Sequence, residues 1–337
     1  MIILFINYYI DKNRSPHGGD ETLMWPLYLA KKNEVYVYQG IKGTKHIKDG
    51  KVCRINSDST NTIIDGDPNN QRQKPGDHTK WDYPNPSSKF SNIILNSDVI
   101  VILGEPAHKD YFQPELNKTK AFIIQQPIYT KPLPISNYIL RNDSFARVIS
   151  DETNTIIKKY RTNTKINNYD IGLVGTIIQR KGQLDFFSKL NPNKVSQYTF
   201  HIVGPVKEKS YLNKIINTCK AKDIKYKFYG KLEGEEYFKH LSSFKCIVHY
   251  SRVDANPRVI WDSIYCGTPY FASNNCEIPE IIHNYGFIDN DINGFYKLLD
   301  TDYKDNIYEF VDNNLQPEKY VNELFLNIIN KFKNLLN

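Results

Sequence analysis

The sequence has few cysteines, and they do not occur in close pairs. Five stand singly among 337 residues, at Cys53, Cys219, Cys246, Cys266 and Cys276. An odd number of cysteines without a Cys-x-x-Cys spacing argues against a disulfide framework and against a structural zinc site. Such a chain suits a reducing compartment, and we expect a cytoplasmic protein.

Long hydrophobic runs are also absent. No segment reaches the roughly 18 uninterrupted apolar residues that a membrane-spanning helix needs. The apolar start, residues 1–10, is shorter than that and has neither a basic flank nor a small-residue cleavage site. We interpret it as the first buried strand of a soluble protein. Peripheral contact with a membrane is left open, because the basic residues of positions 1–160 form no decisive stripe.

The chain has no strong excess of either charge. Its 44 basic and 37 acidic residues give a net charge of +7, far from a polybasic signature, so no nucleic-acid partner is expected. The charge is uneven: +4 over residues 1–160, +9 over 161–276 and −6 over 277–337. The middle block would attract an anion such as a nucleotide diphosphate, or it is a solvated lysine face. Abundant Asn, Lys, Ile and Tyr point to an AT-rich genome, of a bacterium or a large DNA virus.

What the sequence does contain is a succession of short apolar runs rich in β-branched and aromatic residues. Between many of them lie stretches of helical spacing, at 21–31, 183–190, 210–221 and 235–243. This alternation predicts an α/β protein with parallel sheets covered on both faces. Two doubly wound domains fit best, and a single barrel is the alternative. The predicted strands are residues 2–6, 34–38, 99–103, 121–124, 147–150, 171–175, 199–204, 225–230, 246–250 and 269–273.

Polar stretches suggest the domain boundaries. Residues 160–169 show no periodic pattern of apolar residues and are interpreted as a linker. This gives domains 1–160 and 161–316. Residues 56–91, punctuated by proline and glycine, are interpreted as a functional or partly disordered segment. The last stretch, Pro317–Leu336, predicts one amphipathic helix.

A first motif follows the first predicted strand. Gly18 and Gly19, preceded by His17, precede a predicted helix, so the backbone there can approach a ligand beside free N–H groups. A plain strand–helix turn explains the same residues. The loop lacks the full Gly-x-Gly-x-x-Gly fingerprint, which disfavours a nicotinamide enzyme.

A second motif follows the predicted strand that ends at Gly175. Its loop presents Arg180, Lys181 and Gly182 before the next helix. The guanidinium can grip phosphate with two donors, whereas the ammonium acts as a point charge. The spacing is not that of a phosphate-binding P-loop, and a purely structural loop is the alternative.

The third motif begins at Asp254 and leads into a short helix. Asn256 suits the N-cap, Pro257 the first helical position and Gly267 a left-handed end. Asp262 lies within the same helix, and two carboxylates at this spacing can engage hydroxyl groups of a ligand while the helix N-terminus faces a phosphate. Capping alone would explain Asn256, and Asp262 could simply be exposed.

In this order the motifs resemble the family 4 retaining glycosyltransferases. That family has a Gly-Gly loop, a strand–Gly–loop–Lys-Gly motif, and a Glu-x7-Glu motif followed by Gly-Thr-Pro. The corresponding residues are Gly18, Gly19, Gly175, Lys181, Gly182, Asp254, Asp262, Gly267, Thr268 and Pro269. The strands that end at Gly204 and Gly230, and residues 277–282, also match. The resemblance covers most of residues 160–290 and is thin before them. It implies the GT-B fold: two facing Rossmann-like domains, a deep cleft between them, and a last helix that returns to the first domain.

The resemblance implies that a nucleotide-diphosphate sugar binds mainly to the C-terminal domain. Lys181, with Arg180, would neutralise the diphosphate, and Asp254 would hold hydroxyls of the transferred sugar. Lys181 and Asp254 are the implied catalytic residues. The other implied donor contacts are Gly18, Gly19, Gly204, Lys231, Leu232, Asn256, Pro257, Arg258, Val259 and Asp262. Weaker candidates, for the acceptor, are His17, Glu105 and His108. The acceptor would be a glycan, a lipid-linked molecule or a protein. No metal and no further cofactor are expected, and the oligomeric state is not assigned.

The sequence departs from the family pattern at several positions. Both acidic positions are Asp, one methylene shorter than Glu, and Thr176 replaces an arginine, whose charge Arg180 would supply. A histidine of the N-terminal domain corresponds to Gln125 or Gln126, and neither can act as a general base. Retention is thought to proceed by same-face attack, in which the donor phosphate takes the acceptor proton. A sugar-nucleotide epimerase and a degenerate, non-catalytic binding protein remain alternatives. His201 and His249 lie in predicted strands and are interpreted as core residues.

Overall fold

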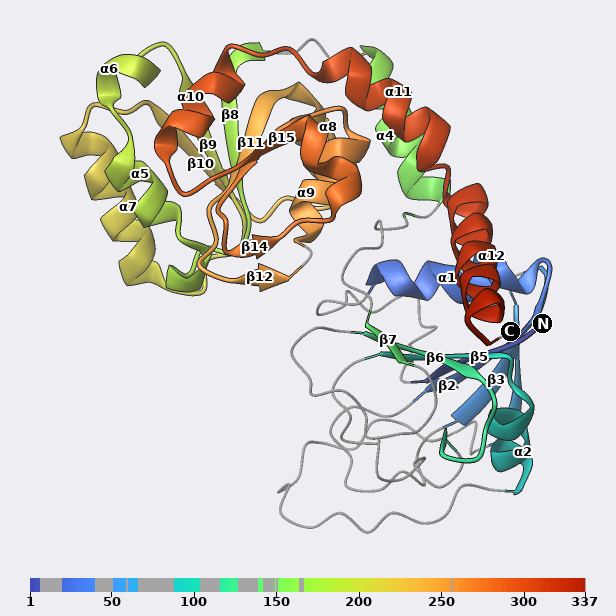
Figure 1. Cartoon of the computed structure of the whole chain (residues 1–337). Coiled ribbons are helices and arrows are strands. Elements are labelled where there is room, and N and C mark those ends of the chain that lie inside the picture. Colours follow the sequence, from blue (N-terminus) through green and yellow to red (C-terminus); the bar gives the residue numbers. More distant parts are fainter. Residues whose placement is uncertain are drawn as a thin grey trace. The chain divides into compact units, whose positions relative to one another are not determined.

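The fold is known from a computed structural model (Figure 1). It describes residues 1–6, 20–39, 51–58, 60–65, 88–103, 116–126, 139–141, 149, 151–163, 167–255 and 257–336. Two compact units make up the chain: Met1–Asp143 with Pro317–Asn337, and Ser144–Gln316. The following paragraphs take each unit by itself.

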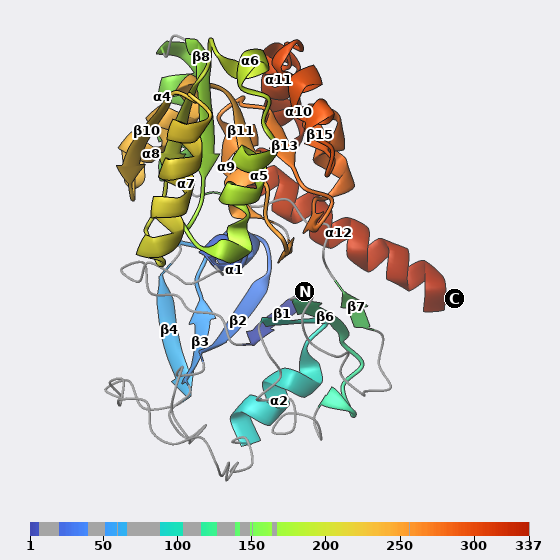
Figure 2. The ribbon, with the colours of Figure 1, turned by 90° about the vertical axis from the view of Figure 1, so that its left-hand side faces the viewer.

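The N-terminal unit contains a seven-stranded sheet in the order β4-β3-β2-β1-β5-β6-β7 (Figure 2). Strands β1, β2, β5, β6 and β7 run parallel, and β3 and β4 are antiparallel additions to one edge. The strands are β1 (Ile2–Ile6), β2 (Glu34–Gln39), β3 (Lys51–Ile55), β4 (Asn61–Asp65), β5 (Val99–Leu103), β6 (Phe122–Gln126) and β7 (Ile139–Arg141). Its helices are α1 (Asp20–Ala30), α2 (Ser88–Asn96) and α12 (Pro317–Leu336).

The sequence predicted the parallel strands of this sheet better than its edge. The strands at residues 2–6, 34–38, 99–103 and 121–124 are confirmed, within two residues at either end. The expectation that residues 56–91 lack structure is wrong at both ends, because β4 lies at Asn61–Asp65 and α2 begins at Ser88. Strand β4 was not predicted, because only three of its residues, Thr62, Ile63 and Ile64, favour a strand within a long polar stretch. Residues 66–87, and most of the strand predicted at 147–150, lie outside the described residues.

Helix α12 packs on α1 and the first strand of this unit. The buried ring of Phe325 meets Trp25 edge-on, with 5.5 Å between ring centroids, and Phe5 at 6.3 Å. Lys31 and Glu318 pair at 2.6 Å beside this contact. The predicted amphipathic helix is therefore present, and Val321 and Phe325 of its apolar stripe are buried. Among the helices of the described residues, none has the length and apolar character needed to cross a bilayer.

The C-terminal unit contains a six-stranded parallel sheet in the order β10-β9-β8-β11-β13-β15. A separate pair of two-residue strands, β12 and β14, lies beside it. The strands are β8 (Asn167–Val174), β9 (Thr199–Val203), β10 (Tyr226–Gly230), β11 (Phe244–His249), β12 (Asp254–Ala255), β13 (Tyr270–Ala272), β14 (Cys276–Glu277) and β15 (Gly286–Ile288). The helices are α4 (Asp151–Asn163), α5 (Gln183–Lys189), α6 (Pro192–Val195), α7 (Lys209–Ala221), α8 (Gly234–Ser243), α9 (Arg258–Tyr265), α10 (Ile292–Leu299) and α11 (Lys304–Asn314). Two 3-10 helices span Gln179–Lys181 and Glu280–Tyr285.

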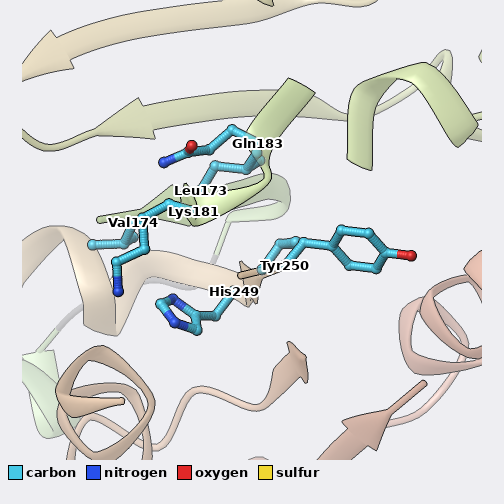
Figure 3. Close-up of a pocket in the computed structure, with 7 residues that line it drawn as sticks. Leu173, Val174, Lys181, Gln183, His249 and Tyr250 are labelled. Atoms are coloured by element: carbon cyan, nitrogen blue, oxygen red, sulfur yellow. The ribbon is translucent and has the colours of Figure 1, made fainter. Parts of the chain in front are cut away.

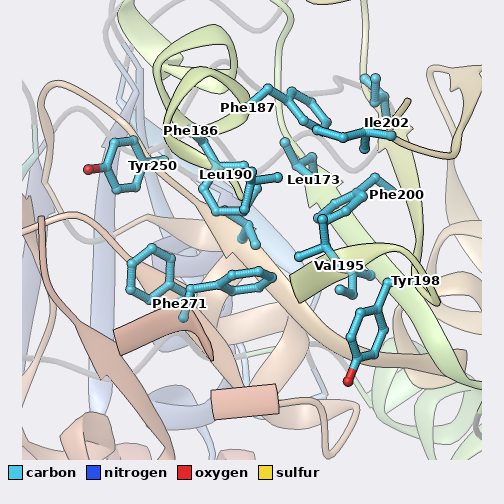
Figure 4. Packing of buried hydrophobic residues seen from close by; sticks show 14 of the residues in the cluster. Leu173, Phe186, Phe187, Leu190, Val195, Tyr198, Phe200, Ile202, Tyr250 and Phe271 are labelled. Atoms are coloured by element: carbon cyan, nitrogen blue, oxygen red, sulfur yellow. The ribbon is translucent and has the colours of Figure 1, made fainter. Parts of the chain in front are cut away.

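Aromatic packing holds one face of this sheet. Phe186 of α5 is fully buried, and its ring lies 5.1 Å from Phe295 of α10 and 6.1 Å from Phe200 of β9 (Figure 4). Helices α5 and α7 cover this face, and α8 and α9 cover the other (Figure 1). Cover on both faces explains the apolar runs within its central strands, such as Cys246–Val248 of β11, and the expected α/β class is confirmed.

The boundary between the units lies at 143/144, not at 160/161 as the sequence suggested. The polar run 160–169 is the last turn of α4 followed by the start of β8. Helix α4 belongs to the second unit because Ile157 is buried and Arg161 bonds Asp312 of α11 at 2.8 Å. Polar side chains on the outer face of α4 therefore resembled a linker.

Arg161 should contribute more to stability than its exposed neighbour Lys159. Its side chain is 7% exposed, bonds both carboxylate oxygens of Asp312 and lies 4.2 Å from the Tyr308 ring. We expect Arg161→Ala to lower the free energy of unfolding by about 2 kcal/mol, because the hydrogen bonds of the buried guanidinium and its contact with the Tyr308 ring are lost. Lys159→Ala, which removes an exposed ion pair to Glu235, should lower the free energy of unfolding much less, because solvent screens that pair. Urea unfolding of both variants tests this, and equal costs would contradict it.

The strand order gives the second sheet a topological switch point between β8 and β11. Strand β8 pairs with β9 on one side and β11 on the other, so the connections leaving these strands turn in opposite directions. Ligands of doubly wound sheets bind at such a switch point. The loop after β8 carries Lys181, and the loop after β11 leads to Asp254.

Candidate functional site

The loops after β8 and β11 form one connected structure. The backbone N–H of Arg252 donates to the carbonyl of Arg180 at 2.9 Å, and Nη1 of Arg180 donates to the carbonyl of Val253 at 2.9 Å. Ser251 Oγ also donates to both carbonyls, at 3.2 and 2.9 Å. The guanidinium predicted to bind phosphate thus has one nitrogen holding the backbone next to Asp254.

Lys181, Asp254 and His249 meet at the centre of these loops. Lys181 Nζ forms an ion pair with Asp254 Oδ2, and His249 Nε2 lies 2.8 Å from the same oxygen. The side chains of Lys181 and Asp254 are 15% and 16% exposed, and that of His249 is 4% exposed. The two catalytic residues predicted from the sequence are therefore brought together, with an unpredicted third.

A small cavity lies beside this cluster (Figure 3). Its volume of about 10 Å³ is the room of roughly one water molecule, so it is no substrate pocket. Gln183 donates its amide N–H to the carbonyl of Thr176 at 2.9 Å, while its buried Oε1 has no hydrogen-bond partner in the described part of the chain. The lining residues are Leu173, Val174, Lys181, Gln183, Val248, His249 and Tyr250.

Burial and the neighbouring groups shift the pKa values of this cluster. Burial alone would raise the pKa of Asp254, but the hydrogen bond and charge of His249, together with Lys181, lower it to about 2. Burial lowers the pKa of His249 below its ordinary 6.5. The carboxylate is therefore ionised at neutral pH, and a neutral His249 must carry its hydrogen on Nε2 to meet that oxygen.

Acid should destabilise the protein through these two groups. A group whose pKa is lower in the native state than in the unfolded state binds protons more tightly when the protein is unfolded. Its contribution to the free energy of unfolding is therefore complete above the unfolded-state pKa and is lost as the pH falls. We expect a loss as pH falls below the ordinary value of 6.5 for His249, and a further loss from Asp254 between pH 3.8 and about 2.

The variant His249→Gln cannot titrate but retains an amide donor. The difference in Tm between wild type and this variant should therefore shrink from pH 8 to pH 5. Melting curves over that range measure it. Parallel curves would show that His249 takes up a proton equally well in both states. The charged groups facing His249 are Asp254 and Lys181, and the backbone of Val174 also influences the ring.

Asp254 is positioned by backbone pairing as well as by its side chain. Strand β12 pairs with β14, which places Asp254 opposite Cys276, and the N–H of Asp254 donates to the carbonyl of Asn275 at 3.3 Å. Nothing in the local sequence signals these two-residue strands. They fix the carboxylate at the end of β11 without a helix or a long strand.

Helix α9 begins one residue later than predicted. Pro257 takes the N-cap position, and the helix runs from Arg258 to Tyr265, so the N–H groups of Arg258 and Val259 are in its first turn. Asn256, the predicted cap, lies outside the described residues. The left-handed Gly267, with φ of 74°, ends the helix as predicted.

Asp262 lies within α9 and faces a neighbouring helix. It is 5% exposed, and its Oδ2 accepts a hydrogen bond of 2.9 Å from the Tyr237 hydroxyl of α8. The alternative that Asp262 is simply exposed is therefore wrong. No motif in the sequence points to Tyr237, which lies 25 residues away along the chain.

Three glycines lie at the ends of the neighbouring strands β8, β9 and β10: Gly175 and Gly204 follow their strands, and Gly230 is the last residue of β10. Gly175 donates its N–H to the carbonyl of Val203 at 2.9 Å, and Gly204 donates to that of Gly230 at 2.7 Å. A Cβ on Gly204 would lie 1.9 Å from the carbonyl oxygen of Gly175. The result is an edge of bare backbone beside the switch point. Lys231 pairs with Glu233 just beyond it, and the adjacent Leu232 is half-buried.

Several predicted residues belong to the N-terminal unit. His17, Gly18, Gly19, Glu105 and His108 lie outside the described residues. The strands that precede them, β1 and β5, are neighbours, with Ile6 opposite Ile102. Across the described part of the chain, no three His, Cys, Asp or Glu side chains gather in a way that could hold a metal ion.

Sequence reasoning missed His249 as a partner of Asp254. In β11, Cys246 and Val248 face the aromatic core, so Ile247 and His249 face the other side of the sheet. The strand ends at His249, five residues before Asp254. The signal available in the sequence was a polar residue, His249, at the end of an otherwise buried strand.

Comparison with known proteins places these features in a family. Residues 156–323 match the family model described as glycosyl transferases group 1. A glycosyltransferase from Rickettsia africae ESF-5 matches with 14% identity and a TM-score of 0.56, over 98% of either chain. AviGT4, a glycosyltransferase involved in avilamycin A biosynthesis, matches with 12% identity and a TM-score of 0.55, over 98% of this chain and 97% of that one. At such identities the likeness shows the fold, which is GT-B. No curated protein matches the sequence significantly.

Proposed function

We propose that the chain, whose residues 156–323 match the group 1 glycosyltransferases, transfers a sugar from a nucleotide-diphosphate donor with retention of configuration and without a metal. The retention of configuration is proposed because the motifs of the chain resemble those of the family 4 enzymes. The proposed acceptor carries a hydroxyl group on a glycan, a lipid-linked molecule or a protein.

The observation that carries the proposal is the meeting of Lys181 and Asp254 at the switch point of the second sheet. A cation and a carboxylate there suit the two halves of a sugar diphosphate, since one attracts phosphate and the other accepts from sugar hydroxyls. The first turn of α9, which begins at Arg258, adds a helix N-terminus to the anion-binding character of this edge.

The chemistry asks the site to stabilise charge on a leaving group. The bond between the anomeric carbon and the phosphate oxygen breaks, and its electron pair passes to the β-phosphate. Lys181 is placed to neutralise that charge, which develops in the transition state. The acceptor oxygen bonds the anomeric carbon on the face that the phosphate leaves. The departing phosphate takes the proton of the acceptor hydroxyl, so no protein base is required.

A panel of nucleotide sugars tests the proposal. We expect one of UDP-, GDP-, ADP- or dTDP-glucose to raise the Tm of the full chain, because a ligand that binds only the native state stabilises it. The same donor should then be hydrolysed slowly or its sugar transferred, with the anomeric configuration retained by NMR. Binding without turnover would favour a non-catalytic protein, and turnover to an isomeric sugar nucleotide would favour an epimerase. Inversion, or loss of turnover in EDTA, would contradict the proposed mechanism.

A further inference from the structure

His249 makes a contact that a core histidine would not need. It stands at the last position of β11 with its side chain 4% exposed, and Nε2 lies 2.8 Å from Oδ2 of Asp254. The same oxygen is paired with Lys181. Two donors thus converge on Oδ2, while Oδ1 has no hydrogen bond or ion pair from the described part of the chain.

We propose that His249 is a positioning residue that holds Oδ2 of Asp254 and thereby directs Oδ1 to a hydroxyl of the transferred sugar. The inference rests on the proposed function. It assigns the sugar contact to one oxygen of one carboxylate, and it gives His249 no direct contact with substrate.

The torsional freedom of the Asp254 side chain determines how firmly its second oxygen is held. An aspartate has two side-chain torsions, so fixing the position of one carboxylate oxygen also fixes the other. A site residue is held in its productive geometry when neighbouring hydrogen bonds lock its rotamer. Lys181 alone cannot provide this lock, because its long flexible chain would turn toward the diphosphate when a donor binds. His249 is the buried partner that stays in place.

The surroundings of His249 suit a fixed neutral donor. Its ring belongs to a central strand, and the backbone of Asp254 is separately held opposite Cys276. Burial lowers the pKa of His249, so at neutral pH the ring adds no charge to the phosphate site. Its contribution is therefore geometric, and it should be measurable only with ligands that contain the sugar.

The experiment compares His249→Gln with His249→Asn. The glutamine amide nitrogen reaches about as far as the Nε2 of histidine, whereas that of asparagine stops near Nδ1. Both variants place a neutral amide at the same buried position, so their stabilities are a fair match. The readout is the ratio of affinities for a sugar nucleotide and for the nucleoside diphosphate without sugar. UDP-glucose with UDP is the first pair, and the GDP, ADP and dTDP pairs follow, by calorimetry on the full chain.

We expect His249→Gln to retain the wild-type ratio within about threefold, and His249→Asn to lower it about 10- to 100-fold, the usual effect of losing a hydrogen bond to a charged group. The affinity for the nucleoside diphosphate alone should be equal in both. In an Asp254→Ala background, His249→Asn should have no further effect on the ratio.

Equal ratios in the two variants, or a loss that also affects the nucleoside diphosphate, would overturn the role of His249 and leave the glycosyltransferase proposal intact. A wild-type protein that binds no sugar nucleotide more tightly than its diphosphate would instead overturn the proposed function, and the role of His249 with it.

Discussion

Replacing Lys181 with alanine is expected to lower kcat/KM for sugar transfer about 100- to 1,000-fold, the range seen when one preorganised charge stabiliser is removed from an active site. Lys181 is 15% exposed, and its ammonium already lies against Asp254 at the switch point. The charge of the leaving diphosphate has to be met at this place as the bond to the sugar breaks. Steady-state kinetics with the donor identified by the thermal-shift panel measures the effect.

Arg180→Ala is the matched control for this variant. The two cations are adjacent in the same 3-10 helix, but the Arg180 guanidinium donates to the carbonyl of Val253. Its loss should lower kcat/KM less than about tenfold, mainly by loosening the loop before Asp254. An equal loss in both variants would mean that the phosphate charge is shared, as the sequence first suggested.

Asp254→Asn separates the two functions of the ion pair. It removes the negative charge that Lys181 faces but preserves side-chain size. Affinity for the nucleoside diphosphate should therefore rise, because the ammonium is no longer neutralised, while transfer falls. A fall in both quantities would show that Asp254 serves chiefly to hold Lys181 in place.

The sequence could predict the parts of this fold that repeat locally. Buried parallel strands such as β1 and β5 are continuous apolar runs, and helices such as α7 and α12 have a regular apolar stripe. Glycine at a helix end, as at Gly267, is equally local, because a left-handed residue is needed there. These features depend on neighbours in the chain.

The sequence could not predict features that depend on distant partners. Helix α4 looked like a linker because its packing rests on Arg161, whose partner Asp312 lies 151 residues away. Strand β4, at the edge of the first sheet, has too few apolar residues to stand out, since an edge strand buries little.

The site divides in the same way. Lys181 and Asp254 were found as motif residues, each in its own loop, but their contact spans 73 residues and appears only when β8 and β11 are neighbours. His249 and Tyr237 were missed because each is an ordinary strand or helix residue until the structure sets it against a carboxylate. The residues proposed to contact the donor were thus predicted from the sequence, whereas the residues that hold their side chains in place were not.

Gly204→Ala is expected to have the largest effect on stability. The position has φ of 148°, and an added Cβ would lie 1.9 Å from the carbonyl oxygen of Gly175 and 2.6 Å from its carbonyl carbon. Both are backbone atoms at the end of the neighbouring strand, so no side-chain rotation relieves the contact. We expect the free energy of unfolding to fall by about 3 to 5 kcal/mol, which corresponds to a drop in Tm of roughly 10 °C for a unit of this size.

Gly175→Ala provides the matched control, because its φ of 149° is nearly identical and nothing lies within 4 Å of the added Cβ. Its cost should be limited to backbone strain, about 1 to 3 kcal/mol. The difference between the two variants therefore measures the steric contact between the ends of β8 and β9. Thermal unfolding of both proteins decides the matter, and equal Tm values would mean that these strand ends separate easily. In that case the bare-backbone edge beside Lys181 would be pliable, and a donor could reshape it on binding.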